Sequence, residues 1–236
     1  MILHTEVRGD GEPVVFLHTA FQTGVHDFEH VAFDLQADFK VILSDLRAHG
    51  KSVTEDVEDY YAKCADDLNE TLEHLGVESA HIIGYSLGGM IGIFFAKQHH
   101  SRVRSLTFSG VMPEVPDNWD ELSKAEADEI TAVMNSRESA AQLDEIHGQG
   151  WRALAHFFLQ PNWYPFEAIG DLRSIQAPML FMVGESQPHE TLGVQRYPAM
   201  NDGVRVAVIP FAGHHVQSEQ PELYAKILRL FIKNIS

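Results

Sequence analysis

A short apolar run, a Gly-Tyr-Ser-Leu-Gly pentapeptide and a helical pattern follow one another between residues 80 and 98. The pentapeptide matches G-x-S-x-G, and its place after a predicted strand and before a predicted helix argues against a chance match. Gly84 and Gly88 lack a Cβ, so the two backbones can approach closely and the turn can tolerate strain. We therefore predict a nucleophile elbow, a tight turn that holds the Ser86 hydroxyl above the sheet. The alternative is a glycine-rich turn around an ordinary buried serine.

Strand-like and helix-like segments alternate along most of the chain, which is typical of parallel sheets joined by helical crossovers. Uninterrupted apolar runs predict central strands covered on both faces. These runs are residues 14–17, 41–43, 82–83, 105–108, 179–183 and 204–209. Amphipathic helices are predicted at 60–75 and 222–235, where apolar residues recur at intervals of three and four. The expected fold class is α/β, with a mostly parallel central sheet and helices on both faces.

Residues 112–170 interrupt this alternation, because they contain no strand pattern. Helices are expected there around 121–134, 140–146 and 151–159, with prolines at their ends and six aromatic residues in the second half. Such an insertion lies most simply as a lid over the strand ends, where open α/β sheets bind ligands. The aromatic residues could instead serve only to attach it. We therefore divide the chain into a core of residues 1–111 and 171–236 and a lid of residues 112–170.

The composition narrows the classes of partner and compartment. The 236 residues suit one α/β domain with a modest insertion, and the net charge of −17 argues against nucleic acid or an anionic membrane as a partner. No apolar run reaches the roughly 18 residues of a membrane-spanning helix, and the first residues show a strand pattern instead of a signal peptide. The single cysteine, Cys64, excludes an intrachain disulfide and favours a reducing compartment. We expect a cytoplasmic protein.

Patterns for metals and cofactors do not occur in the sequence. The pairs His99-His100 and His214-His215 lack acidic residues at H-E-x-x-H spacing, and no glycine-rich phosphate motif follows a predicted strand. We therefore expect no metal, no cofactor and a small molecule as the partner. The sequence contains no signal for an oligomeric state.

Four local motifs occur in the order and at the spacings of one known family. They are Val14-Val15-Phe16-Leu17-His18, Asp45-Leu46-Arg47-Ala48-His49-Gly50-Lys51-Ser52, the elbow around Ser86, and Gly213-His214-His215 with Glu219-Gln220-Pro221. The second is similar to D-x-R-G-H-G-x-S, with Ala48 for the first glycine, and the last is similar to G-H-x-x-x-x-E-x-P. Together they resemble the α/β-hydrolase fold family over essentially the whole chain, in particular serine esterase and lactonase members with a small helical lid.

The resemblance implies that Ser86 is the nucleophile and His214 its general base. A serine hydroxyl needs a partner that takes its proton during attack, and an imidazole titrates near neutrality. His215 is the adjacent alternative, and we prefer His214 because it directly follows Gly213 and precedes the closing helix. The resemblance also places the oxyanion hole at the amides of Leu87 and Ala20. Thr19 stands where the family usually has glycine, a poor choice if that position needs positive φ.

The acid that should orient the histidine is where the sequence departs from the family. The family usually has an aspartate three residues after the glycine that ends the strand, and here that residue is Gln187. Another carboxylate (Glu185, Glu114 or Asp117) is one explanation. Alternatively, the amide oxygen of Gln187 fixes the histidine tautomer without supplying charge. The third explanation is a weakened hydrolase or a deliberate substitution.

Two functions from different classes follow. The first is a serine hydrolase that cleaves a small, largely apolar carboxylic ester or lactone through an acyl-enzyme on Ser86. Ser86 argues against the relatives that use an aspartate nucleophile, and Gly88-Gly89-Met90 is similar to enol-lactonases. The second is a weakly active or inactive protein of the same fold that binds a small molecule.

Overall fold

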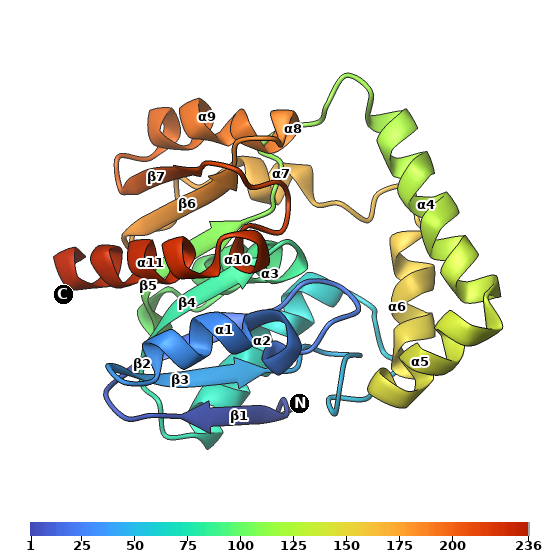
Figure 1. Ribbon diagram of the computed structural model, residues 1–236, viewed down its shortest axis with the longest axis horizontal. Coiled ribbons are helices and arrows are strands. Elements are labelled where there is room, and N and C mark those ends of the chain that lie inside the picture. Colours follow the sequence, from blue (N-terminus) through green and yellow to red (C-terminus); the bar gives the residue numbers. More distant parts are fainter. Residues whose placement is uncertain (236) are drawn as a thin grey trace.

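The computed structural model describes residues 1–235, and within them the centre is a seven-stranded sheet in the order β1-β3-β2-β4-β5-β6-β7 (Figure 1). The strands are β1 (Thr5–Arg8), β2 (Glu12–Leu17), β3 (Phe39–Ser44), β4 (Ala80–Tyr85), β5 (Val103–Ser109), β6 (Met179–Gly184) and β7 (Val204–Ile209). β1 pairs antiparallel with β3, and all other neighbours are parallel. The predicted apolar runs lie within β2 to β7, so the predicted fold class is confirmed.

Helices cover both faces of this sheet. Those of the core are α1 (Gly24–Leu35), α2 (Tyr60–His74), α3 (Leu87–Gln98), α8 (Pro188–Thr191), α9 (Gly193–Met200), α10 (Val216–Glu219) and α11 (Pro221–Ile235), with a 3₁₀ turn η1 (His100–Arg102). α1 and α11 pack together in one apolar cluster, and α2 and α3 pack together in the other. In the described part of the chain, no helix combines the length and apolar character that a membrane crossing needs.

Between β5 and β6 the chain forms α4 (Trp119–Asn135), α5 (Arg137–His147), α6 (Gly150–Phe158) and α7 (Phe166–Gly170). We call residues 112–170 the insertion. Figure 1 shows α4, α5 and α6 together beyond one end of the sheet, on the side to which the parallel strands point. The first three helices fall where the sequence predicts them.

The turn between β4 and α3 is strained and tightly packed. Ser86 has φ 53° and ψ −114°, and its N–H donates to the carbonyl oxygen of Ser109 at 2.9 Å. A Cβ on Gly84 would lie 2.1 Å from the Gly88 carbonyl oxygen, and one on Gly88 would lie 1.9 Å from that of Leu17. Neither glycine therefore leaves room for a side chain, and the predicted tight strand-to-helix turn is confirmed.

Replacing Gly88 by alanine should destabilise the fold strongly, because the atom in the way is a backbone oxygen that cannot rotate aside. We expect Gly88→Ala to lower the free energy of unfolding by more than about 3 kcal/mol, above ordinary overpacking. Gly76→Ala is the control: it meets no atom within 4 Å and has only the left-handed φ of +66° to overcome, about 1–2 kcal/mol. Urea denaturation measures both, and equal losses would contradict the steric argument.

Candidate active site

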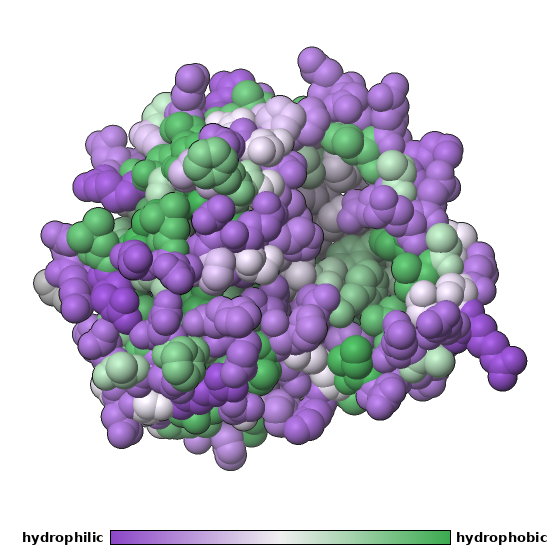
Figure 2. All heavy atoms as spheres, in the orientation of Figure 1, coloured by the Kyte–Doolittle hydropathy of each residue, from purple (hydrophilic) through white to green (hydrophobic). Residues whose placement is uncertain are grey.

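A cavity of about 860 Å³ lies between the core and the insertion. Figure 2 shows the hollow between these two parts, with hydrophobic residues inside it. The core side consists of the loop after β2, the elbow after β4 and the loop after β7, and the opposite wall comes from α4, α5 and α6. The cavity therefore gathers segments that are far apart in the sequence.

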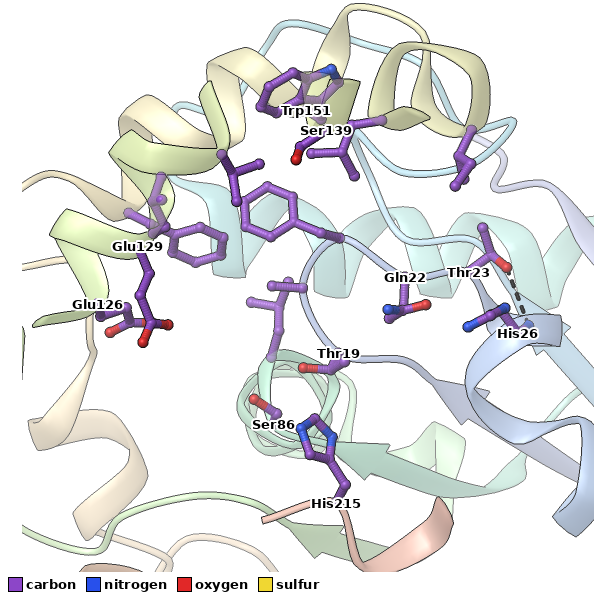
Figure 3. Close-up of a pocket in the computed structure, with 18 of the residues that line it drawn as sticks. Thr19, Gln22, Thr23, His26, Ser86, Glu126, Glu129, Ser139, Trp151 and His215 are labelled. Atoms are coloured by element: carbon purple, nitrogen blue, oxygen red, sulfur yellow. Dashed lines mark hydrogen bonds between the residues drawn. The ribbon is translucent and has the colours of Figure 1, made fainter. Parts of the chain in front are cut away.

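Ser86 lines this cavity with its side chain partly exposed (Figure 3). The neighbouring Leu87 is the first residue of α3, so its N–H lies at the positive end of the helix dipole. Ala20 and Leu87 both line the cavity, and neither backbone N–H makes a hydrogen bond within residues 1–235. The structure thus brings the predicted nucleophile and both predicted amide donors to one place.

In the loop after β2, Thr19 does not adopt the positive φ that would make threonine a poor choice. The residue of this loop with a positive φ is Phe21, at 59°. The side chain of Asp27 accepts the Thr19 N–H at 2.9 Å. Threonine at this position therefore introduces no left-handed strain.

His214 also lines the cavity, and its Nδ1 lies 2.5 Å from Oε1 of Glu190. Glu190 belongs to α8 and is only 5% exposed. A carboxylate accepts hydrogen bonds, so Nδ1 carries the proton and Nε2 of His214 keeps its lone pair for another partner. Oε2 of Glu190 is buried and has no hydrogen-bond partner in the described residues. The contact with His214 is therefore the hydrogen bond that this carboxylate makes.

None of the carboxylates that the sequence offered as the acid is hydrogen-bonded to His214 among the described residues. Glu185 accepts the N–H of Phe211 at 2.8 Å, and Glu114 pairs with Arg196 at 2.8 Å. Neither Asp117 nor Gln187 makes a hydrogen bond with His214 among the described contacts.

Sequence reasoning missed Glu190 because it stands three residues beyond the usual position. A signal was present. Pro188 is typical of the first position of a helix, and one helical turn brings residue 190 to the side of residue 187.

His215 is held by a different kind of group. Its Nδ1 lies 2.7 Å from the hydroxyl of Tyr85, and burial raises the pKa of Tyr85 far above its usual range, so this partner is a neutral phenol. Figure 3 shows the His215 ring beside Ser86 in this view. The two imidazoles, 5.3 Å apart between ring centroids, both line the cavity. A carboxylate stabilises a positively charged imidazolium, whereas a neutral phenol does not. His214 and His215 therefore differ in the charge of the group that holds them.

The wall formed by the insertion is mostly apolar, with the polar side chains of Ser139 and Gln142 and two carboxylates. Glu126 and Glu129 extend from α4 side by side into the cavity (Figure 3). Burial, and then the neighbouring Glu129, raise the pKa of Glu126 to about 7, and His214 opposes this shift. Neither carboxylate forms an ion pair with a lysine or arginine of the described chain. This end of the cavity therefore gains negative charge as the pH rises through neutrality.

Within residues 1–235, no three or more histidine, cysteine, aspartate or glutamate side chains are grouped as a metal site.

Comparisons with known proteins agree with this architecture. Residues 12–132, about half of the chain, match the family described as alpha/beta hydrolase fold. Carboxylesterase YbfK of Bacillus subtilis is 25% identical over 90% of this chain and 77% of its own length. The 3-oxoadipate enol-lactonase 1 of Acinetobacter baylyi is 22% identical over 99% of this chain and 94% of its own length.

A solved structure shows the same fold over nearly the whole chain. NosK from Streptomyces actuosus superposes with a TM-score of 0.80 at 23% identity, covering 96% of this chain and 99% of its own. The residues that match the alpha/beta hydrolase fold family include β2, β3, β4, β5, the elbow and Ser86. The chain belongs to the α/β-hydrolase fold family.

Proposed function

We propose that this protein is a serine hydrolase that cleaves a small, largely apolar carboxylic ester or lactone through an acyl-enzyme on Ser86. The observation that carries the proposal is the contact between His214 and the buried Glu190 at the cavity that also contains Ser86. Nucleophilic catalysis needs an oriented imidazole at the same cavity as a serine on a strained elbow, and His214 and Ser86 both line this cavity. The names of the relatives, a carboxylesterase and an enol-lactonase, support the same bond type.

In the proposed reaction, Oγ of Ser86 attacks the carbonyl carbon while Nε2 of His214 takes its proton. The amides of Ala20 and Leu87 hold the negative oxygen of the tetrahedral intermediate. His214 then gives the proton to the leaving alkoxide, and the acyl group stays on Ser86. A water molecule then attacks the acyl-enzyme while His214 takes its proton. His214 returns that proton to Oγ of Ser86 as the carboxylic acid leaves.

Glu190 has two tasks in this mechanism. It keeps the proton of neutral His214 on Nδ1, which leaves Nε2 free to act as the base. It also places a negative charge 2.5 Å from the ring, where it stabilises the imidazolium that forms during attack. Gln187 could do only the first, so Glu190 supplies what the usual aspartate supplies.

The insertion serves as the lid of this site in our proposal. Its residues form the wall opposite Ser86, and their aromatic side chains include Trp151, Phe158 and Trp163. An apolar wall favours an apolar acyl or alcohol group, because burial of such surface is the main source of binding free energy. The substrate is therefore a small molecule that fills part of about 860 Å³.

The alternative of an inactive binding protein depended on the missing acid at Gln187. With Glu190 beside His214, that argument loses its support. Labelling with a fluorophosphonate probe separates the two functions.

We expect the probe to label wild-type protein at Ser86, and p-nitrophenyl esters of short acyl chains to be hydrolysed. Ser86→Ala should abolish both, and His214→Ala should lower both by about 10³-fold or more. His215→Ala is the matched control and should retain most of the activity. Mass spectrometry detects the label on Ser86, and the absorbance of released nitrophenolate reports hydrolysis. Both are measured on variants whose circular dichroism matches the wild type. No labelling of folded wild-type protein would support the binder.

The role of Glu190 leads to a second prediction. Glu190→Gln keeps the size of the side chain but removes its charge, so kcat should fall by about 10³–10⁴-fold with KM little changed. Gln187→Asp should give no gain, because the acid position is already served from α8. Steady-state kinetics of both variants on one p-nitrophenyl ester decides the point. A rise in kcat for Gln187→Asp together with full activity of Glu190→Gln would return the role to residue 187.

Glu126 should make binding of anionic esters depend on pH. Its carboxyl is neutral below its pKa of about 7 and negative above it. KM for a 4-nitrophenyl hemisuccinate should therefore rise several-fold as the pH rises from about 6 to about 8, because like charges repel strongly at a low effective dielectric constant. The neutral 4-nitrophenyl butyrate is the matched substrate and should show no such rise. Glu126→Gln should flatten the difference, and a difference that persists in this variant would contradict the assignment.

A further inference from the structure

Three buried histidines contact the backbone of the loop that carries the proposed Ala20 donor. His18, His49 and His147 are each fully buried, and their rings contact in sequence at 4.8 Å and 5.5 Å between centroids. His18 and His49 belong to the core, whereas His147 belongs to the insertion as the last residue of α5.

His18 sets the direction of the Ala20 N–H. Its Nδ1 lies 2.6 Å from the carbonyl oxygen of Thr19, and its Nε2 accepts the N–H of Leu46 at 2.9 Å. The peptide between Thr19 and Ala20 is trans, so its C=O and N–H point in opposite directions. The Ala20 N–H therefore points away from the His18 ring.

The next residue, Phe21, is held at both ends of its backbone. Nε2 of His49 accepts the Phe21 N–H at 3.0 Å, and Nε2 of His147 lies 3.1 Å from the Phe21 carbonyl oxygen. Phe21 has a φ of 59°, a conformation that costs a residue with a side chain about 1–2 kcal/mol. Such strain persists only where the surroundings fix it.

Backbone partners also fix the tautomers of these rings. Nδ1 of His147 accepts the Gly50 N–H at 2.8 Å, so the ring proton is on Nε2 and is donated to Phe21. Nδ1 of His49 lies 3.0 Å from the Arg47 carbonyl oxygen and carries the proton there. Burial lowers the pKa of His49 and of His147, which keeps both rings in this neutral form.

The side chain of Phe21 reaches the insertion as well. Its ring packs against Trp151 and Phe158 of α6, at 6.4 Å and 5.8 Å between centroids. Phe21 thus meets the insertion through both its carbonyl group and its ring, although His147 is 126 residues away in the sequence.

We propose that His147 is a positioning residue for the oxyanion hole: by holding the Phe21 carbonyl it keeps the strained Phe21 backbone in place, and with it the loop whose Ala20 amide is aimed by His18. Docking of the insertion and formation of the oxyanion hole are then one event, because the same imidazole belongs to α5 and binds the loop after β2. The inference rests on the proposed function, since Ala20 is a donor only if an oxyanion forms there.

Two amide substitutions separate this role from simple anchoring of α5. In His147→Asn the amide oxygen is placed near the position of Nδ1, where it can accept from Gly50, but nothing reaches Phe21. In His147→Gln the amide nitrogen is placed near the position of Nε2, where it can donate to Phe21. Positioning of Ala20 requires the second contact, whereas anchoring requires the first.

We expect His147→Asn to lower kcat on a p-nitrophenyl ester by about 10–100-fold with KM changed less than about twofold, as for a misaimed transition-state donor. His147→Gln should recover most of that loss. The same kcat in His147→Asn as in wild type, or losses in both variants that follow only their melting temperatures, would overturn the inference.

Amide hydrogen exchange gives a readout that needs no substrate. Exchange in a peptide covering residues 18–24 should rise in His147→Asn and stay near wild type in His147→Gln, while residues 47–52 stay protected in His147→Asn. Unchanged exchange at 18–24 in His147→Asn overturns the inference. Wild-type protein that hydrolyses no ester defeats the proposed function instead, and the exchange data then decide whether His147 positions this loop.

Discussion

The close approach of the first turn of α3 to the end of β2 is the constraint on which the rest of the site depends. Gly88 lies so near the carbonyl oxygen of Leu17 that no side chain fits between them. This contact places the positive end of α3, with the Leu87 amide, next to the loop that starts after β2. Ala20 is three residues beyond Leu17, so the two proposed donors meet as a direct result of backbone packing. The strained φ of Ser86 follows from the same tight turn.

Much of this arrangement was predictable from the sequence because it depends on local patterns. Apolar runs located β2 to β7, and the glycines located the elbow. His214 could be named as the candidate base because it directly follows Gly213 in a local motif. The partners of these residues were not predictable in the same way. Glu190 reaches His214 because α8 turns it toward the loop after β7. Pro188 marks the start of that helix, but no local pattern shows which residue the helix will face.

His147 shows the same limit more strongly. Its sequence context is the end of an amphipathic helix, which fits an ordinary surface helix. What makes it distinctive is a pair of backbone partners, Gly50 and Phe21, each about 100 residues away or more. A contact between the insertion and the core depends on how these two parts of the chain pack against each other. Such docking is decided by burial and polar satisfaction over the whole interface, and single residues carry little sign of it.

The environment of Glu190 argues for a functional pressure on that carboxylate. One of its oxygens is buried without a hydrogen-bond partner, and the other faces an imidazole. Removing such a group from water opposes folding, and a neutral glutamine in the same place would oppose it less. The compensating attraction appears in full only when His214 becomes positive. In the proposed mechanism that happens as Ser86 attacks, so the charge of Glu190 stabilises the transition state more than the resting protein, which is the condition for it to accelerate the reaction.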